Sequence, residues 1–475
     1  MSGFETVIGL EVHAQLLTNT KAFCLSDNNF GDEPNSNIGP VSIGLPGALP
    51  VLNDKAIELA IRAGVALDCE INPCSIFSRK NYFYPDLPKG YQISQFDKPI
   101  CTGGKIVIEL NENETKTINL ERIHMEEDAG KSIHLPSASL INLNRSGVPL
   151  IEIVTKPDLR SANEASSYLR KLHAILMFAE VCDGNLEQGN FRCDVNVSVR
   201  PIGQKELGTR AEIKNINSFR FVEKAIEFEV ARQVAVVQSG QKVIQETRGW
   251  DSGANKTFSM RTKENANDYR YFPEPDMPPL IVTEEFINQI RSNMPELPNQ
   301  MEKRFQDSYN LSLLDAKELS TTKKLSDYFE EVCKHKVSPK LASNWILSEL
   351  LRVLKEKDLQ INESPIEPER LAKMIALIEK GDISGKIAKS VFAEMLESSK
   401  LPGEIVTEKG LVQINDEKTI NNWIQEVIET SPEQVKSYKE GKTKLFGFFV
   451  GQVMKKSAGK ANPEILNKLI KVKLS

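Results

Sequence analysis

The segment FETVIGLEVHAQL, close to the start of the chain, alternates apolar and polar side chains over its whole length. Successive side chains of a β-strand point to opposite faces of the sheet, so this period of two predicts a half-buried strand. The apolar face consists of Phe4, Thr6, Ile8, Leu10, Val12, Ala14 and Leu16. The other face carries Glu11 and His13, a carboxylate and an imidazole that together can bind a metal ion. The alternative is an ordinary strand whose polar face is exposed to solvent.

The segment FRCDVNVSVRP alternates in the same way. Its apolar face consists of Phe191, Cys193, Val195, Val197 and Val199. Its polar face carries Arg192, Asp194 and Asn196, which can bind a polyphosphate and its magnesium ion, because Mg²⁺ prefers oxygen ligands. Further along, GTRAEIKNINSF places Glu212 and Lys214 on one face of a short strand. An ordinary solvated strand face is the alternative here too.

Glu152 lies inside the apolar run of VPLIEIVTKPD. Such a run is typical of a strand that is buried on both faces, and an ionised carboxylate is rarely buried without a partner. We therefore expect a cation or a basic side chain to contact Glu152. The alternative is a salt bridge in the core with no part in chemistry.

The segment HMEEDAGK sets three carboxylates side by side. If it is a strand, His124, Glu126 and Asp128 share one face and Glu127 points to the other. Together with the carboxylates of neighbouring strands, part of this segment can complete an oxygen-rich magnesium site. A solvated acidic turn is the alternative.

The segment FSRKNYFYPDLPKGYQISQ interleaves cations with aromatic rings, among them Arg79, Lys80 and Lys89. Lysine and arginine neutralise phosphoryl oxygens, and aromatic faces stack on nucleobases. The segment therefore offers the cations and aromatic rings that a site built only from carboxylates lacks. The alternative is an aromatic loop that packs on the core and leaves its charged tips in solvent.

A chain of 475 residues exceeds what one hydrophobic core usually supports, so we expect two or three domains. Residues 4 to about 279 read as short strands with one clear helix at 162–179. From about residue 295 the apolar period becomes helical, and LPGEIVTEKG then interrupts it before a last helical module. That module is rich in lysine: Lys436, Lys439, Lys442, Lys444, Lys455, Lys456, Lys460, Lys468, Lys471 and Lys473.

The composition is that of a globular protein, with 40% hydrophobic and 26% charged residues and a formal net charge of −5. This balance indicates neither a nucleic-acid nor a membrane partner for the whole chain. The seven cysteines have no regular spacing, and no secretory signal or membrane-spanning run is visible, so we expect a cytoplasmic protein. GKS at 130–132 lacks the earlier glycine of a phosphate-binding loop, and no motif for a side-chain nucleophile is present.

Eight long segments resemble the B subunits of bacterial tRNA-dependent amidotransferases, in the same order and over essentially the whole chain. They are FETVIGLEVHAQL, GLPGALPVLN, RKNYFYPDLPKGYQISQFD, HMEEDAGKS, NRSGVPLIEIV, FRCDVNVSVRP, EIKNINSF and DYRYFPEPDMPPL. The resemblance implies an α+β protein with three domains. A β-rich, cradle-shaped kinase domain would span 1–293, an all-α helical domain 294–404, and a small helical YqeY-like tail domain that binds tRNA 405–475.

The resemblance also implies the reaction. Such a protein uses ATP and Mg²⁺ to phosphorylate the side-chain carboxylate of misacylated Glu-tRNA(Gln) or Asp-tRNA(Asn). Ammonia from the amidase, which is the A subunit, then displaces the phosphate, and a small C subunit supports the heterotrimer. The sequence leaves open which of the two tRNAs is the substrate. A charge relay along the ammonia path would profit from mixed acidic and basic groups.

Carried onto this chain, the resemblance assigns roles to individual positions. The residues expected at the magnesium site are Glu11, His13, Glu126, Glu127 and Glu152. Those expected to contact phosphate, the aminoacyl end or ammonia are Lys80, Lys89, Arg192 and Lys214. Asp194 and Asn196 are further candidates for binding the cofactors, ATP and its metal ion. Among these, Glu11, His13, Glu127, Glu152 and Lys89 are the expected catalytic residues.

One departure concerns zinc. Many members of the family carry a zinc knuckle made of two cysteine pairs, whereas this chain keeps Cys24 and has Ser26, Gly39 and Ser42 at the other positions. Structural zinc normally needs four thiolates, or three with a histidine. We therefore expect no zinc and a loop that is held by packing.

Two rival functions remain open at this point. A metal-dependent nuclease could use the same carboxylates, and it would cleave RNA without ATP. An adaptor that only presents tRNA to the amidase would tolerate alanine at Glu11 and Glu152.

Overall fold

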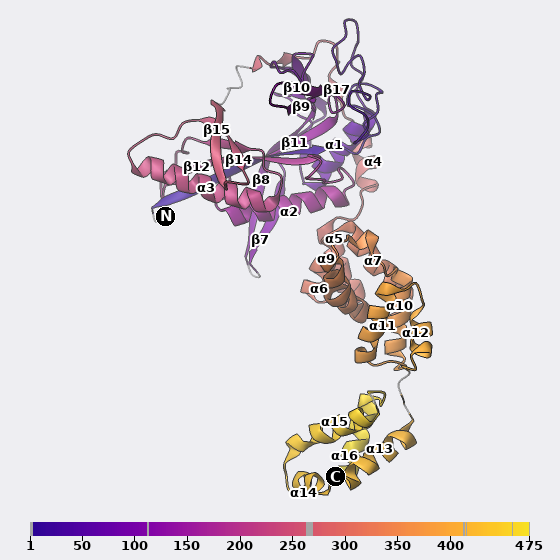
Figure 1. Cartoon of the computed structure of the whole chain (residues 1–475). Helices are drawn as coiled ribbons and strands as arrows, with labels where there is room; N and C mark the ends of the chain where they lie inside the picture. The colour runs from indigo at the N-terminus through magenta and orange to yellow at the C-terminus, as the bar shows by residue number, and fades with distance from the viewer. Residues whose placement is uncertain are drawn as a thin grey trace. The chain divides into compact units, whose positions relative to one another are not determined.

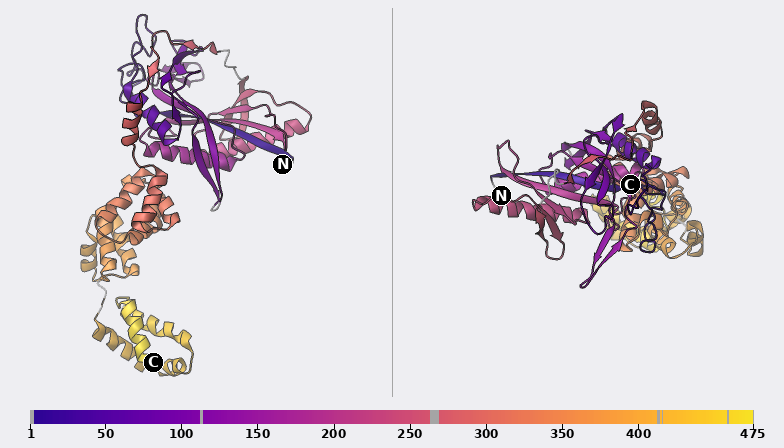
Figure 2. Two further views of the ribbon diagram at one scale, coloured as in Figure 1. Left: turned by 180° about the vertical axis from the view of Figure 1, so that it is seen from behind. Right: turned by 90° about the horizontal axis from the view of Figure 1, so that it is seen from above.

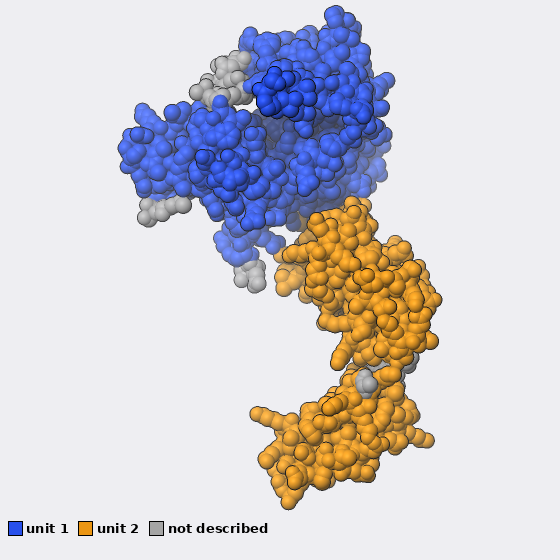
Figure 3. Space-filling view, viewed as in Figure 1, with its two compact units in different colours: residues 1–298 blue, residues 299–475 orange. Residues whose placement is uncertain are grey.

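The computed structural model describes residues 3–111, 114–262, 269–411, 414, 416–457 and 459–474. The chain divides into two compact units, 1–298 and 299–475, which are coloured separately in Figure 3. The α+β class expected from the resemblance is confirmed by the mixed sheet of the first unit and the helices of both. The proposed boundaries near residues 293 and 404 stay predictions.

A ten-stranded mixed sheet forms the centre of the first unit (Figure 1). In order across the sheet its strands are β15 (Lys256–Thr262), β14 (Glu246–Asp251), β13 (Ala211–Lys214), β12 (Phe191–Pro201), β1 (Phe4–Gln15), β11 (Pro149–Thr155), β8 (Glu114–Glu127), β6 (Cys101–Thr102) and β2 (Glu70–Ile71). β7 (Lys105–Asn111) pairs with β8 outside this order, and the two project as a hairpin (Figure 2). Apart from the parallel pair β13–β14, the paired strands of this sheet are antiparallel.

The period-two pattern of the first strand is confirmed. Ile8, Leu10, Val12 and Ala14 of β1 are buried at 0–1% exposure and belong to the main hydrophobic core. The same core contains the apolar residues of β12 and those of two helices, α2 (Ala162–Phe178) and α3 (Phe219–Gln238). These helices cover the apolar face of the sheet, which leaves the polar residues of β1 and β12 on the opposite face.

Both helices begin at a serine N-cap, because a hydroxyl satisfies backbone N–H groups that have no partner within the helix. Ser161 accepts from Glu164 N, and Ser218 accepts from Phe221 N at 3.2 Å. The helix expected at 162–179 is therefore confirmed. A further helix in this region, α1 (Asp54–Ala66), was not expected, although Asn53 caps it in the same way.

Short strands and a helix complete the first unit. They are β3 (Cys74–Ser75), β4 (Phe77–Asn81), β5 (Tyr91–Gln95), β9 (Lys131–His134), β10 (Ser139–Asn142), β16 (Phe272–Pro273), β17 (Leu280–Ile281) and α4 (Glu284–Ser292). β4 pairs with β5 and with β16, so the cationic and aromatic segment around Lys80 is ordered as a small sheet.

The helical pattern predicted from about residue 295 is confirmed. The helices are α5 (Pro298–Tyr309), α6 (Leu313–Leu319), α7 (Lys323–Lys334), α8 (Pro339–Asn344), α9 (Leu351–Glu356), α10 (Pro368–Glu379), α11 (Gly385–Glu397), α12 (Pro402–Glu408), α13 (Glu417–Glu429), α14 (Pro432–Lys439), α15 (Phe446–Lys456) and α16 (Pro463–Leu474). A π-helical turn, Trp345–Leu350, joins α8 to α9. The residues after 416 form their own core, around Ile420, Phe449 and Leu466. Among the described residues, no helix is both long and apolar enough to cross a membrane.

Candidate active site

The register of three neighbouring strands forms the centre of the site. His13 of β1 lies opposite Glu152 of β11, which in turn lies opposite His124 of β8. Glu152 Oε2 is 3.5 Å from His13 Nε2 and 3.0 Å from His124 Nε2. The basic partner expected for the carboxylate inside the apolar run is thus a pair of imidazoles.

These contacts shift the pKa values of His13 and Glu152. Burial of the His13 ring opposes its protonation, but the charges of Glu152 and Glu126 outweigh burial and raise the pKa of His13 to about 9. Burial raises the pKa of Glu152, yet His124 and His13 more than compensate and hold the pKa of this carboxyl well below its usual range. The structure therefore stabilises a carboxylate anion at Glu152.

Glu126 completes a group that can bind a metal ion. Its Oε1 is 3.4 Å from His13 Nε2, and one ligand atom from each of His13, Glu126 and Glu152 lies within 4.8 Å of the others. We call these three residues the histidine cluster. The second carboxylate oxygen of Glu126 is buried and has no hydrogen-bond partner among the described residues. A buried acceptor without a donor is costly, so this oxygen fits a bound cation.

A second group lies beside the first. Glu11, Asp194 and Glu212 also present ligand atoms within 4.8 Å of one another, and we call them the carboxylate cluster. Glu11 and Asp194 come from opposed positions of β1 and β12, and Glu212 comes from β13. Asn196 donates to Glu11 Oε1 at 2.9 Å, so its side chain orients the carboxylate.

Lysine side chains partly neutralise both clusters. Lys214 Nζ lies 2.5 Å from Asp194 Oδ2 and 3.7 Å from Glu212 Oε1. Burial lowers the pKa of Lys214, but Asp194 and Glu212 outweigh it and raise the pKa. Lys80 behaves in the same way toward Glu126 and Glu152, which raise its pKa against the effect of burial. Both lysines are therefore ammonium ions at neutral pH.

The two clusters face a cleft formed by adjoining cavities. A cavity of about 590 Å³ is lined by His13, Glu126 and Arg192, and one of about 280 Å³ is lined by Glu11, Glu152 and Glu212. Four residues line both: His13, Lys80, Asp194 and Lys214. A third cavity, of about 160 Å³, shares Glu11 and Arg210 with the second. It reaches Gly9 and Thr155 on the neighbouring strands.

Some of the expected site residues lie apart from the two clusters. Lys89 forms an ion pair with Glu127, and both side chains are only 2% exposed. Glu127 Oε1 also accepts from Ile93 N at 2.9 Å, and Glu127 belongs to neither cluster. The roles expected for Lys89 and Glu127 stay predictions.

Two arginines form specific ion pairs. Arg192 lines the larger cavity and lies 2.8 Å from Asp128 Oδ2, so part of its charge is already balanced. Arg79 forms a bidentate pair with Glu274 at 2.7 and 2.8 Å, away from the described cavities. Of the carboxylates in HMEEDAGK, Glu126 thus belongs to the histidine cluster, Glu127 pairs with a lysine, and Asp128 pairs with an arginine.

Two site residues, Glu212 and His124, were missing from the expected set. Glu212 was noted only as a neighbour of Lys214 on a strand face, and the four-residue strand β13 gives little periodicity. His124 was placed on the same face as Glu126, but its contact with Glu152 follows from the pairing of β8 with β11. The alternation of residues predicts which face of the sheet a side chain lies on. Only the order of the strands shows which side chains it contacts there.

The four positions of the missing zinc knuckle still converge. Cys24 Sγ is 3.6 Å from the hydroxyls of Ser26 and Ser42, and a Cβ added at Gly39 would lie 2.3 Å from Ser26 Oγ. Nearby, the wholly buried Lys21 donates to the carbonyl oxygens of Asn144 and Ser146. One thiol and two hydroxyls are a poor zinc set. The expected absence of zinc stays a prediction.

Comparisons with known proteins identify the family of this chain. Residues 6–288 match the family described as GatB/GatE catalytic domain, and residues 327–474 match the one described as GatB domain. The chain therefore belongs to the family of amidotransferase B subunits. Three relatives are named as B subunits of the aspartyl/glutamyl-tRNA(Asn/Gln) amidotransferase: the protein of Thermodesulfovibrio yellowstonii, 54% identical over 98% of both chains; that of Bdellovibrio bacteriovorus, 54% over 99% of both; and that of Carboxydothermus hydrogenoformans, 51% over 100% of both.

Proposed function

We propose that this protein phosphorylates the side-chain carboxylate of glutamate or aspartate on a misacylated tRNA with ATP, and then exchanges the phosphate for ammonia. The observation that supports this most strongly is the row of His13, Glu126 and Glu152, next to the carboxylate cluster, inside a cleft that two partly buried lysines also line. Phosphoryl transfer brings several negative charges together, so it depends on positioning and on cations rather than on a side-chain nucleophile.

The histidine cluster would hold the first Mg²⁺ and the carboxylate cluster a second. The orphaned oxygen of Glu126 supports the first assignment. Gln95 offers a donor for the phosphates instead of a ligand for a metal ion: it is 2% exposed, lines the same cavity as Glu11 and Glu212, and has a buried Nε2 with no partner among the described residues. When bound, the magnesium ions supply positive charge for the phosphates of ATP.

Lys80 and Lys214 would contact the transferred phosphoryl group. In the first step an oxygen of the substrate carboxylate forms a bond to the γ-phosphorus, and the bond from phosphorus to the β–γ bridging oxygen breaks to release ADP. In the second step ammonia attacks the carbonyl carbon, phosphate leaves, and the nitrogen loses a proton to a base in the cleft.

The cavity at Gly9 and Thr155 suits the nucleotide base. It adjoins the cleft through Glu11, and the glycine presents only backbone on this wall, with the Thr155 hydroxyl 3.9 Å from where a Cβ would be. A flat ring can approach a backbone that carries no side chain. ATP would thus lie with its base near Gly9 and its phosphates toward Lys80.

The remaining roles concern partners. An amidase, the A subunit, would supply ammonia, a small C subunit would support the heterotrimer, and the buried pair Lys89–Glu127 would lie on the ammonia path. The lysines of α14 to α16 would bind tRNA, since lysines displace counterions from phosphates. We further propose that residues 294–404 and 405–475 are separate domains and that the complex acts in the cytoplasm.

The reaction is tested with the purified heterotrimer, misacylated tRNA, glutamine and ATP. We expect Gln-tRNA or Asn-tRNA from the unmodified complex and a loss of at least about a hundredfold with Glu152→Ala. Glu58→Ala on helix α1 is the matched control, because the ion pairs of Glu58, with Lys55 and Arg62, lie outside the site. Full amidation by Glu152→Ala would indicate an adaptor, and RNA cleavage without ATP would indicate a nuclease.

A further inference from the structure

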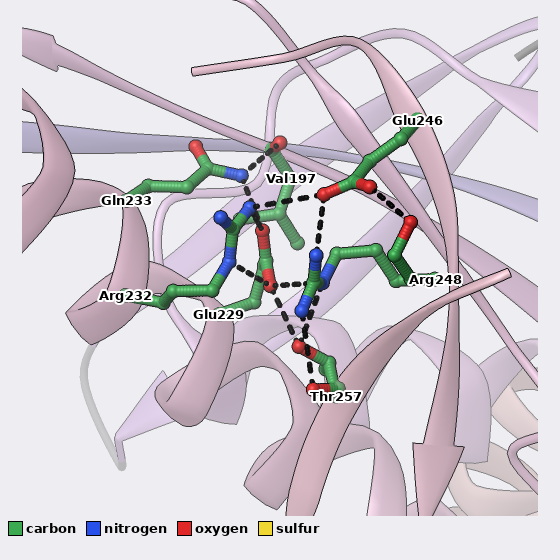
Figure 4. Close-up of polar contacts among 8 residues, drawn as sticks. Val197, Glu229, Arg232, Gln233, Glu246, Arg248 and Thr257 are labelled. Carbon is green, nitrogen blue, oxygen red and sulfur yellow. Dashed lines mark hydrogen bonds and ion pairs between the residues drawn. The ribbon is translucent and has the colours of Figure 1, made fainter. Parts of the chain in front are cut away.

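A buried ion network lies behind the sheet, on the side of helix α3 (Figure 4). At its centre is Glu229, whose side chain is 0% exposed. Glu229 accepts from Arg232 at 2.6 and 3.0 Å, from Gln233 at 2.8 Å and from Thr257 at 3.0 Å. The carboxylate is therefore fully paired, as a buried charge must be.

The network fixes strand β14 to its neighbours. Arg248 of β14 lies 3.3 Å from Glu229, donates to the hydroxyl of Thr257 at 2.9 Å and also pairs with Glu246 (Figure 4). Gln233 donates to the carbonyl oxygen of Val197 at 3.0 Å. Helix α3 is thus connected to β12, β14 and β15 by hydrogen bonds and an ion pair, which together fix its position relative to these strands.

Side chains of β14 alternate between the two faces of the sheet. Glu246 and Arg248 point to the ion network, so Thr247 between them points to the cleft. Its hydroxyl donates to Glu212 Oε2 at 2.8 Å, and both residues are buried, at 2% and 6% exposure. Thr247 and Glu212 are also opposed in the parallel pairing of β14 with β13.

We propose that Thr247 is a positioning residue that orients Glu212 for the second metal ion of the cleft. The hydroxyl engages Oε2, whereas Oε1 lies 3.7 Å from Nζ of Lys214, whose ammonium also contacts Asp194 of the carboxylate cluster. Glu212 belongs to a strand of only four residues, so its direction depends on the neighbours of that strand. The ion network fixes β14 from the opposite face of the sheet, and the hydrogen bond from Thr247 then fixes the orientation of the Glu212 carboxylate.

This inference rests on the proposed function only for the presence of a metal at the carboxylate cluster. Residues that orient a metal ligand typically account for about a 10- to 100-fold change in metal affinity. The hydroxyl is the relevant group, because threonine and valine have nearly the same shape.

The test measures Mn²⁺ binding to the full chain by electron paramagnetic resonance and calorimetry, with Mn²⁺ alone as the probe. We expect two sites in the unmodified chain, and a loss of affinity of about 10-fold or more at one of them in Thr247→Val. Thr247→Ser should restore that affinity, and Thr247→Ala should behave like the valine variant. A variant of the other cluster, Glu126→Gln, should weaken the other site instead.

Thermal unfolding of each variant separates a lost orientation from a lost fold, because a variant that unfolds like the unmodified chain retains β14. Equal Mn²⁺ binding by Thr247→Val and the unmodified chain would overturn the inference, and so would a single Mn²⁺ site in the unmodified chain. Failure of the amidation assay with the expected Mn²⁺ pattern would overturn the proposed reaction alone.

Discussion

The protonation of His13 should make the stability of the metal-free first unit depend on pH. Glu152 and Glu126 raise the pKa of His13 from 6.5 to about 9, despite its burial. Between these values the folded chain holds a proton that the unfolded chain has released, so the free energy of unfolding falls as pH rises. The shift corresponds to about 3 kcal/mol, which is fully present below pH 6.5 and lost by about pH 9.

Substitution of the larger contributor should flatten this dependence. In Glu152→Gln only Glu126 still favours the imidazolium, so we expect more than half of the decline to disappear. Glu126→Gln should have a smaller effect, because its oxygen contributes less to the charge on His13 than that of Glu152. Glu330→Gln in the second unit is the control: Glu330 has a lowered pKa, so it titrates only below the window from pH 6.5 to 9.

The assay is urea unfolding in chelator at several pH values, followed by the fluorescence of Trp250. This is the only tryptophan of the first unit, so Trp345→Phe and Trp423→Phe remove the signal of the second unit. Differences between variant and parent cancel the other groups that titrate in this range. Parallel curves for Glu152→Gln and its parent would refute the reasoning, because the charge of Glu152 would then have no effect on His13.

Three further predictions follow from the same contacts. Burial lowers the pKa of Lys21 to about 8, so the folded chain loses the Lys21 proton at lower pH than the unfolded chain does. The free energy of unfolding should therefore increase between pH 8 and 10.5. Urea unfolding should show this increase in the parent but not in Lys21→Met. Glu229→Ala removes the buried carboxylate shared by Arg232 and Arg248 and leaves Glu246 as their remaining acidic partner, so it should cost about 3 kcal/mol in the same assay. Glu227→Ala on the exposed side of α3 should cost less than about 0.5 kcal/mol. Lys80→Met should lower kcat for ATP hydrolysis about 100-fold and, because Lys80 offsets the charges of Glu126 and Glu152, should also lower the melting temperature of the metal-free chain, while Lys55→Met on α1 should alter neither.

Sequence reasoning located the strands of the site because their apolar and polar residues alternate without interruption. Glu11, His13 and Glu152 were expected to act together, and strand pairing places His13 against Glu152. Glu127 was expected on the face opposite Glu126, and it does pair there with Lys89. What alternation cannot supply is the order of strands across the sheet.

The residues missed in the sequence show the same limit. Glu212 reaches the cleft only because β13, itself four residues long, is inserted between β12 and β14. Helix α1 escaped notice because its buried residues, Ala56, Ile57, Leu59, Ala60 and Ile61, form a nearly continuous apolar run rather than a stripe. The pairing of strands that are distant in the sequence, and the burial of a helix on most of its surface, are not visible in the local periodicity of apolar residues.

The arrangement of charges in the first unit follows from a conflict between function and stability. Carboxylates gathered within 4.8 Å of one another repel, and burial makes that repulsion stronger, so the cleft opposes its own folding when no cation is bound. On the same face, Lys80, Lys214 and the imidazoles offset part of this repulsion. On the opposite face, other contacts stabilise the fold against the remaining repulsion. They are an apolar core under β1 and β12 and an ion network under β14, in which each charged group drawn in Figure 4 has a partner. Strands that carry unfavourable charge toward substrate are thus held from behind by contacts that take no part in chemistry, and for this reason substitutions behind the sheet should alter metal affinity as well as stability.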